Sequence, residues 1–338
     1  MLSLIKETAM VLHTSNMTYI LGSLLVALLV SVYLVVVLLS HTPRKPHPEE
    51  LEYSTIEDGS DEGIRKGKVP TSAEDGIVLS VVVPSYNETG RILTMLTDAV
   101  EFLQKTLPDQ WEIVIVDDGS ADGTTDYCLK LSRDTFHLKS GQLRVIKFVE
   151  NRGKGGAVRQ GMMHIRGKYG LFADADGASK FSDSKMLLEA IQSMEKPSKN
   201  STSTQAAMAI GSRAHMVNTE AVIKRSFIRN CLMYGFHTLV WVFGIHSIND
   251  TQCGFKMFNR EAIDAIFPYM HTEGWIFDIE ILLLGLKKNI QYREIPVSWH
   301  EVDGSKMDLA IDSLMMAKDL VIIRMAYVLG VYNANKEC

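Results

Sequence analysis

Five short apolar runs alternate with helical segments between residues 77 and 215. They open the stretches "IVLSVVVPSYNE", "WEIVIVDDGS", "LRVIKFVENRG", "KYGLFADADG" and "AAMAIGSRAH". Consecutive apolar positions are typical of strands that are covered on both faces. Strands separated by helices build a mostly parallel sheet, so we predict an α/β fold with helices on both sides of that sheet.

A polar motif follows each of these runs. The motifs are "PSYNE" (84–88), "DDGS" (117–120), "NRGKGG" (151–156), "DADG" (174–177) and "GSR" (211–213). Open α/β sheets bind ligands beyond the carboxyl ends of their strands. We therefore expect the five motifs to line a single active cleft.

The pair Asp174 and Asp176 is the most informative of these motifs. Positions i and i+2 of a strand share a face, so the two like charges need a cation between them or a shared proton. We predict that both carboxylates bind Mg²⁺ or Mn²⁺, which also holds a diphosphate and neutralises its charge as it leaves. Two alternatives are a phosphatase that uses Asp174 as a nucleophile, although such enzymes carry DxDG early in the domain, and a plain turn.

Two other strand ends carry side chains that suit a nucleoside. Tyr86 can stack on a base, and Glu88 can accept hydrogen bonds from a ribose or a base. Neighbouring strand residues point in opposite directions, so we expect Asp118 to face the ligand and Asp117 to be its structural partner. A turn with a helix-capping Asp or Ser is the competing interpretation.

The glycine-rich segment 151–161 can bring backbone amides close to an anion at the start of a helix. Lys154 and Arg159 add positive charge there. The segment lacks the GxxxxGK[ST] pattern of a P-loop, and close packing of a helix on the sheet is the other reason for its glycines.

Residues 19–39 are apolar and carry no charge. As a helix this stretch is long enough to cross a bilayer, and no A-x-A cleavage pattern follows it. We predict a retained transmembrane anchor after a short segment, 1–18. Arg44 and Lys45 after the anchor, against Lys6 and the amino terminus before it, place the rest of the chain in the cytosol by the positive-inside rule.

The remaining regions differ in composition. Residues 40–76 are rich in proline, glycine and acidic side chains, and we predict a flexible linker there. Beyond residue 215, "AVIKRSFIRNCLMYGFHTLVWVFGIHS" and "DLVIIRMAYVLGVY" are either core helices or helices in a membrane interface. The net charge of −5 argues against nucleic acid as a partner. Four widely spaced cysteines without a CxxC pair suit a reducing compartment.

Eight motifs together occur in the order and spacing of a known family. "VVVPSYNE", "VDDGS", "NRGKGGA", "DADG", "GSRAH", "DTQCGFK", "WIFDIEIL" and "VSWHEVDGSK" resemble the GT-A glycosyltransferases of family 2 over residues 77–330. The resemblance implies a GT-A fold with an N-terminal transmembrane helix and C-terminal membrane-interface helices. It also implies a nucleotide-sugar-binding half at 77–215 and an acceptor-binding part at 216–338.

The motifs are most similar to family members that transfer glucose from UDP-glucose to dolichyl phosphate with inversion. The resemblance therefore implies a single-pass enzyme of the endoplasmic reticulum membrane with a cytosolic catalytic domain. Its product, dolichyl β-D-glucosyl phosphate, would be the lipid-linked glucose donor for assembly of the N-glycan precursor. A related transfer from GDP-mannose stays an alternative, because no single residue here distinguishes uracil from guanine.

The resemblance also implies roles for single residues. Positions expected to hold the uridine are Pro84, Tyr86, Glu88, Val116 and Asp118. Those expected around the diphosphate are Lys154, Asp174, Ala175, Asp176 and Lys306, with Asp174 and Asp176 as metal ligands. Those expected at the acceptor phosphate and its pocket are Arg213, either Arg225 or Arg229, Gln252 and Ser305. The residues expected to carry catalysis are Asp176, Asp278 and Arg213.

Asp278 and Glu280 occupy the region where many relatives carry a catalytic base. A phosphate monoester, with a second pKa near about 6, is already largely anionic at neutral pH. Such an acceptor needs positioning and charge screening more than deprotonation. We therefore expect Asp278 to orient groups and not to be essential as a base.

Overall fold

The computed structural model describes residues 2–59, 63–196, 204–216, 235, 238, 239, 242, 245–302, 304 and 309–338. The chain forms two compact units, one of residues 1–41 with 321–333 and a larger one of residues 42–320 with 334–338.

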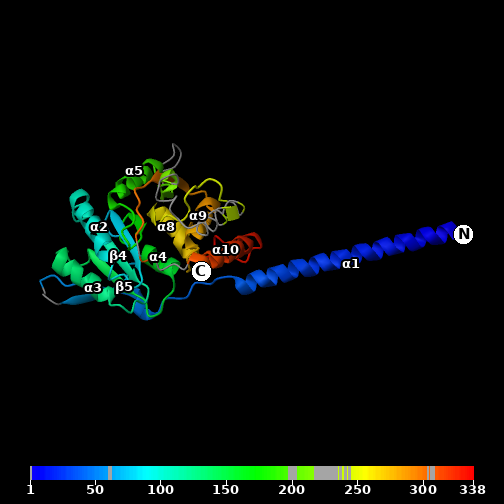
Figure 1. The fold of residues 1–338 in the computed structure, drawn as a ribbon, viewed down its shortest axis with the longest axis horizontal. Helices are drawn as coiled ribbons and strands as arrows, with labels where there is room; N and C mark the ends of the chain where they lie inside the picture. Colours follow the sequence, from blue (N-terminus) through cyan, green and yellow to red (C-terminus); the bar gives the residue numbers. More distant parts are fainter. Residues whose placement is uncertain are drawn as a thin grey trace. The chain divides into compact units, whose positions relative to one another are not determined.

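The described part of the larger unit contains a nine-stranded mixed sheet in the order β2-β1-β5-β4-β3-β6-β8-β7-β9 (Figure 1). Its strands are β1 (Glu52–Ile56), β2 (Ile64–Lys68), β3 (Leu79–Ser85), β4 (Trp111–Asp117), β5 (Leu143–Lys147), β6 (Tyr169–Ala173), β7 (Ala207–Ser212), β8 (Phe255–Asn259) and β9 (Gln291–Pro296). The centre of the sheet, from β5 to β6, is parallel. The predicted mostly parallel α/β sheet is thereby confirmed.

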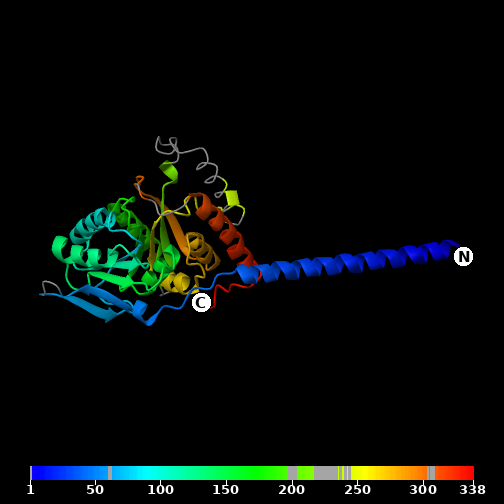
Figure 2. The same cartoon turned by 60° about the horizontal axis from the view of Figure 1, so that its bottom comes forward.

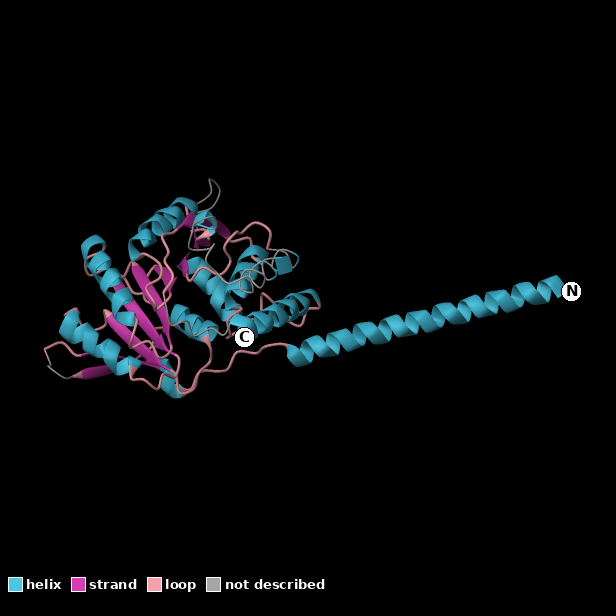
Figure 3. Ribbon diagram, viewed as in Figure 1, coloured by secondary structure: helices cyan, strands magenta, loops and turns pink. Residues whose placement is uncertain are grey.

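Helices cover both faces of this sheet (Figure 3). Val81 and Val83 of β3 belong to a core shared with α2 (Ile92–Thr106) and α5 (Ser184–Met194). On the opposite face, Gly161 of α4 (Lys154–Met163) lies against Val82, where a side chain would collide with it. Further α-helices in the described part of the chain are α3 (Thr124–Lys130), α8 (Arg260–Ile266), α9 (Phe277–Lys287) and α10 (Leu309–Val328). Burial of alternate residues on both faces explains the uninterrupted apolar runs in the sequence.

The prediction of a flexible linker at 40–76 is wrong for much of that stretch. Residues 48–51 form the short 3₁₀ helix η1 (Pro48–Leu51), and β1 and β2 pair as an antiparallel hairpin that joins β5 (Figure 2). The hairpin is charged because it lies at the sheet edge, where most β2 side chains face solvent. Its composition therefore resembles that of a disordered segment although its backbone is paired.

The boundary predicted after residue 215 does not separate two structural layers. Strand β8 inserts between β6 and β7 and is antiparallel to both, and β9 adds to β7 in parallel. Residues beyond 216 thus complete the sheet that the earlier strands begin.

In the smaller unit, α1 (Leu2–Leu39) contains one segment, Met17–Leu39, that is long and apolar enough to cross a membrane. Its apolar side chains are largely exposed, as expected of a helix that has no protein core to enter. Of the two segments expected in the membrane interface, the first falls mostly outside the described residues, and residues 319–328 of the second form the last part of α10. Their contact with a membrane stays a prediction.

Candidate active site

The DADG turn follows β6 directly and presents two acidic side chains. The backbone N–H of Asp174 donates to the carbonyl of Gly254, and a methyl group on Gly254 would lie 2.0 Å from Asp174 Oδ2. Only glycine at 254 allows the carboxylate to occupy this position. Asp176 Oδ1 accepts a hydrogen bond from the backbone N–H of Ala178, 3.0 Å away. Both aspartates are half-buried.

Lys154, the first residue of α4, faces this turn. Its Nζ lies 2.7 Å from Asp174 Oδ1 and over the rings of Phe172 and Trp275. Burial disfavours the ammonium, but Asp174, Asp278 and Asp176 outweigh that effect and raise the pKa of Lys154. The side chain is therefore a cation at the predicted diphosphate site.

The glycines around Lys154 pack against protein. Gly156 donates its backbone N–H to the carbonyl of Glu273, and side chains at Gly153 or Gly155 would collide with residue 273 or with Phe277. Close packing therefore accounts for these glycines, and it brings Lys154 beside the start of α9. Arg159 lies far along the helix and donates to the carbonyl of Phe267, away from the turn. It does not supply the charge near the anion that its position in the motif suggested.

Asp278 lies in the first turn of α9 and is paired with Lys256 of β8. Lys256 is fully buried, and its Nζ donates to Asp278 and to the carbonyl of Cys253. Burial raises the pKa of Asp278, Lys256 and Lys154 oppose that rise, and Asp174 adds to it. Lys256, Asp278, Lys154 and Asp174 thus alternate in charge from the core toward the DADG turn.

Glu280 is not placed to act as a base. It is fully buried, and its carboxylate accepts the backbone N–H groups of His271 and Thr272 together with the Thr272 hydroxyl. Its function is to hold the segment that precedes α9.

Arg213 follows β7 and is fixed by Asp250. The guanidinium donates Nε and Nη2 to the two carboxylate oxygens of Asp250, at 2.7 and 2.9 Å, and stacks on Trp299. Glu294 in turn accepts the backbone N–H of Asp250. Burial opposes the charge on Arg213, but Asp250 outweighs it and raises the pKa, so the guanidinium is a permanent cation. Its planar fork suits a phosphate.

The predicted uridine contacts lie at neighbouring strand ends. Pro84 and Val116 are opposite each other in the β3–β4 ladder, and Tyr86 is exposed. Glu88 is buried and paired with Arg91, whose Nε lies 2.8 Å from Glu88 Oε2. Their contact with a nucleoside stays a prediction.

Asp118 is buried, and its two oxygens accept the backbone N–H groups of Arg152 and Gly153, at 2.6 and 2.9 Å. Burial is the largest influence on this carboxyl and raises its pKa to about 6, although those bonds oppose the rise. Asp117, the expected structural partner, accepts the Ser120 backbone N–H and the Thr125 hydroxyl. Both residues therefore organise the loops of the cleft.

Four other predicted residues, Arg225, Arg229, Ser305 and Lys306, lie outside the described part of the chain. Ala175 is buried within the DADG turn. Gln252 is half-buried, and its Nε2 lies 3.9 Å from Met316 Sδ of α10.

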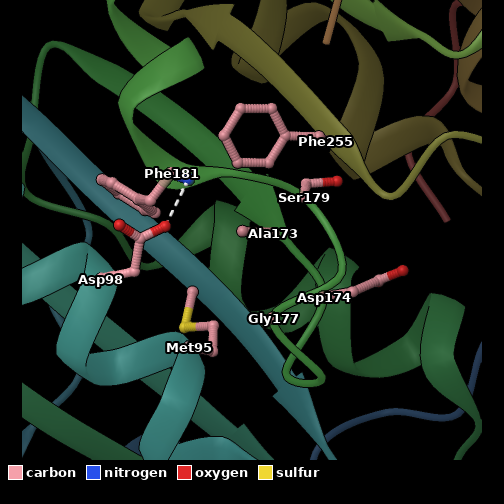
Figure 4. Close-up of a pocket in the computed structure, with 8 residues that line it drawn as sticks. All are labelled: Met95, Asp98, Ala173, Asp174, Gly177, Ser179, Phe181 and Phe255. Atoms are coloured by element: carbon pink, nitrogen blue, oxygen red, sulfur yellow. Dashed lines mark hydrogen bonds between the residues drawn. The ribbon is translucent and has the colours of Figure 1, made fainter. Parts of the chain in front are cut away.

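A small pocket adjoins the DADG turn (Figure 4). Asp98 of α2 accepts the backbone N–H of Phe181 there, whereas Asp174 is directed to the other side of the turn. A second hollow shares Asp98 and Gly177 and continues to Trp299. The backbone of residues 298–300 bonds to Ala178 and Lys180, so the Arg213 region and the DADG turn are joined.

The sequence did not predict a site role for four residues: Arg91, Asp250, Lys256 and Trp299. Asp250, Lys256 and Trp299 lie within the family motifs, but nothing in the motifs pairs them with Arg213 or Asp278. Arg91 is a helix-start residue with an ordinary local pattern. Its pKa is raised by Glu88 and, more weakly, by Asp176 and Asp174. The Arg91 guanidinium therefore interacts electrostatically with both aspartates of the DADG turn.

The donor set at the turn fits a divalent cation that is shared with a ligand. Among the described residues no group of three or more His, Cys, Asp or Glu side chains is arranged to hold a metal ion. Two carboxylates are hard oxygen donors of the kind that Mg²⁺ and Mn²⁺ prefer, and they leave coordination positions for diphosphate oxygens. The Asp174 carboxylate occupies the space beside Gly254 that a methyl group would otherwise take, so the glycine sets the position of this donor.

The site thus combines a mixed sheet, a DxD turn, an arginine held by an aspartate and an acid paired with a lysine, an arrangement that suits a nucleotide-sugar transferase. Residues 80–267 match the model of glycosyl transferase family 2, and the chain belongs to that family.

The relatives specify the group further. Over 325 residues the chain is 66% identical to the dolichyl-phosphate beta-glucosyltransferase of Saccharomyces cerevisiae, covering 96% of this chain and 97% of the yeast protein. It is 43% identical to the dolichyl-phosphate beta-glucosyltransferase of Homo sapiens, covering 76% and 78%. The crystal structure of mannosyl-3-phosphoglycerate synthase from Rubrobacter xylanophilus is similar in fold, with a TM-score of 0.50, 16% identity and 78% of each chain covered. The expected GT-A fold is confirmed.

Proposed function

We propose that this protein transfers glucose from UDP-glucose to dolichyl phosphate with inversion, giving dolichyl β-D-glucosyl phosphate. The observation that carries this proposal is the 66% identity to the yeast enzyme over nearly the whole length of both chains. The alternatives, transfer from GDP-mannose and an aspartyl-phosphate phosphatase, are less consistent with relatives named for glucosyl transfer.

The donor diphosphate is proposed to bind at the DADG turn. Asp174 and Asp176 would hold Mg²⁺ or Mn²⁺, which when bound screens the charge that develops on the leaving diphosphate. Lys154 lies beside Asp174 and can donate to a diphosphate oxygen without changing its protonation state. Tyr86 and Asp118, at the neighbouring strand ends, would bind the nucleoside.

The acceptor phosphate is proposed to bind at Arg213. One phosphate oxygen of the lipid attacks the anomeric carbon of glucose from the side opposite the diphosphate, the bond to the diphosphate oxygen breaks, and UDP leaves with that electron pair. The configuration therefore inverts. Since the attacking oxygen is already anionic, the step needs orientation and charge screening from the protein. Bonded to Lys256, Asp278 fits an orienting role.

The membrane location follows from the same reaction. A polyprenyl acceptor stays in the bilayer, and the helix Met17–Leu39 would keep the enzyme beside it. We propose the endoplasmic reticulum membrane, with the catalytic domain on the cytosolic side, because Arg44 and Lys45 follow the helix.

The test is incubation of the purified full-length protein with labelled UDP-glucose and polyprenyl phosphate, with Mn²⁺ or with EDTA. Labelled lipid that appears only with the metal supports the proposal. Faster transfer from GDP-mannose would replace the donor assignment. EDTA-resistant activity with a trapped aspartyl phosphate would replace the reaction class.

A further inference from the structure

Glu50, in the segment predicted to be a flexible linker, is a fully buried carboxylate. Oε1 accepts Arg44 Nη2 at 2.6 Å and the Val149 backbone N–H at 3.1 Å, and Oε2 accepts the His47 backbone N–H at 2.9 Å. Gln160 of α4 donates to the Glu50 carbonyl. Burial opposes the charge, but the bonds from Arg44, His47 and Val149 outweigh it and lower the pKa of Glu50. These donors compensate the free-energy cost of burying the carboxylate, which would be large if the charge were unpaired.

Residues 44–50 contact the side chain of Arg152, which lies in the glycine-rich motif. Arg152 Nη2 donates to the Arg44 carbonyl at 2.7 Å, and Nη1 lies 3.8 Å from Glu50 Oε2. Arg152 Nε donates to Glu273 at 2.9 Å, and the guanidinium stacks on Phe148. The Arg152 side chain is 1% exposed, and its Nε and Nη2 both donate hydrogen bonds within this cluster.

The other end of Arg152 belongs to the candidate active site. Its backbone N–H and that of Gly153 are the two donors to Asp118, and the next residue, Lys154, contacts Asp174. A displacement of the Arg152 side chain therefore moves the backbone that holds a predicted uridine contact and the cation at the predicted diphosphate site.

We propose that residues 44–50 are a positioning element for the nucleotide sugar, in which Glu50 and Arg44 set the place of the 152–154 loop through Arg152. The element lies outside the 80–267 region that matches the family model and directly follows the predicted anchor in the chain. This inference rests on the proposed function, since it assigns the loop to UDP-glucose.

A purely structural role of Glu50 would lead to a different experimental result. If Glu50 only stabilised the fold, its replacement would lower the unfolding temperature and leave the affinity of correctly folded protein for nucleotide unchanged. A positioning role changes nucleotide affinity and spares the acceptor, because Arg213 and Asp250 share no contact with residues 44–50 among the described interactions.

The experiment compares full-length Glu50→Gln with Glu49→Gln, an exposed neighbour in the same 3₁₀ helix. UDP binding is measured by calorimetry with Mn²⁺, and KM is measured separately for UDP-glucose and polyprenyl phosphate. We expect Glu50→Gln to weaken UDP binding and raise the KM for UDP-glucose by about tenfold, since the loop that holds Asp118 and Lys154 is then less well fixed. The KM for polyprenyl phosphate should stay within about twofold, and Glu49→Gln should match wild type.

Arg44→Ala is the second variant, because it keeps the backbone carbonyl that Arg152 uses and disturbs the core less. It should weaken UDP binding in the same direction by a smaller factor. Wild-type UDP affinity in both folded variants, or an equal rise in KM for both substrates, would overturn the inference. Wild-type protein that binds UDP but forms no glucosylated lipid would overturn the proposed function and leave the UDP-binding comparison to decide the inference.

Discussion

Lys154 Nζ lies 2.7 Å from Asp174 Oδ1, so a lysine of α4 already neutralises the first aspartate of the DADG turn. The same lysine faces Asp278, which pairs with buried Lys256. Acidic and basic groups from four separate segments thus form one connected chain of charges. Because each of these side chains is partly or fully buried, a change in the charge of one of them should alter the electrostatic environment of its neighbour.

Lys154→Met should raise the affinity for Mn²⁺ in the absence of nucleotide, because the competing cation beside Asp174 is gone. The same change should lower kcat/KM for UDP-glucose by about tenfold to a hundredfold, since the diphosphate loses a charged donor. Metal titration followed by manganese resonance spectroscopy and steady-state kinetics measure the two effects. Weaker metal binding in the variant would contradict this account of the pair.

Gly254→Ala should abolish most metal-dependent transfer, with a fall of at least about a hundredfold, because the new methyl group takes the place of Asp174 Oδ2. Gly90→Ala is the matched control, since a Cβ at Gly90 meets nothing within 4 Å. Circular dichroism should show that both variants are folded. Full activity in folded Gly254→Ala would show that the carboxylate position is not needed.

Asp278→Asn should keep activity within about a hundredfold of wild type, because the lipid phosphate needs no general base. It should nevertheless lower the free energy of unfolding by about 3–5 kcal/mol, since Lys256 is left as an unpaired buried charge. Adding Lys256→Met should restore much of that stability. Denaturant unfolding and initial rates of the wild type and the two variants test both statements, and a larger fall in activity of folded protein would reassign Asp278 as a base.

Arg213→Lys and Asp250→Asn should both raise the KM for polyprenyl phosphate, by about tenfold or more, and leave the KM for UDP-glucose nearly unchanged. Lysine cannot reproduce the two hydrogen bonds that the Arg213 guanidinium donates to the Asp250 carboxylate. Asparagine at position 250 removes the negative charge that holds the guanidinium in place. Substrate titrations at saturating co-substrate measure the two constants. A rise confined to the KM for UDP-glucose would place Arg213 at the donor instead.

Asp118 should give the stability a defined pH dependence. Its pKa is about 6 in the folded protein against an ordinary value of 3.8, so the folded state binds this proton more tightly than the unfolded state does. The contribution of Asp118 to the free energy of unfolding is therefore unperturbed below about pH 4 and falls by up to about 3 kcal/mol as the pH rises to about 6. Urea unfolding from pH 4 to 7 should show a steeper decline for wild type than for Asp118→Asn. Parallel curves would contradict the raised pKa.

Local pattern was sufficient for the central sheet and for the position of its motifs. An apolar run such as 79–83 is buried on both faces wherever the neighbouring strands come from, and the residue that follows it must emerge at the carboxyl edge. The placement of Asp174 beside Asp176 and of both beyond β6 depends on nothing more distant than the strand itself.

Four features of the fold and the site depended on contacts between distant parts of the chain. The hairpin of β1 and β2 is charged because one of its strands is a solvent-exposed edge, and only pairing with β5 distinguishes it from a linker. Gly254 leaves room for Asp174 although the two residues are far apart in sequence.

The pairing of Asp278 with Lys256, and of Arg213 with Asp250, likewise arises where β7, β8 and α9 meet. Side-chain identity shows that a group can carry charge, but its partner, its burial and therefore its pKa are properties of the assembled fold. For that reason the chemistry of the cleft could be anticipated from the chain, whereas the network that holds it in place could not.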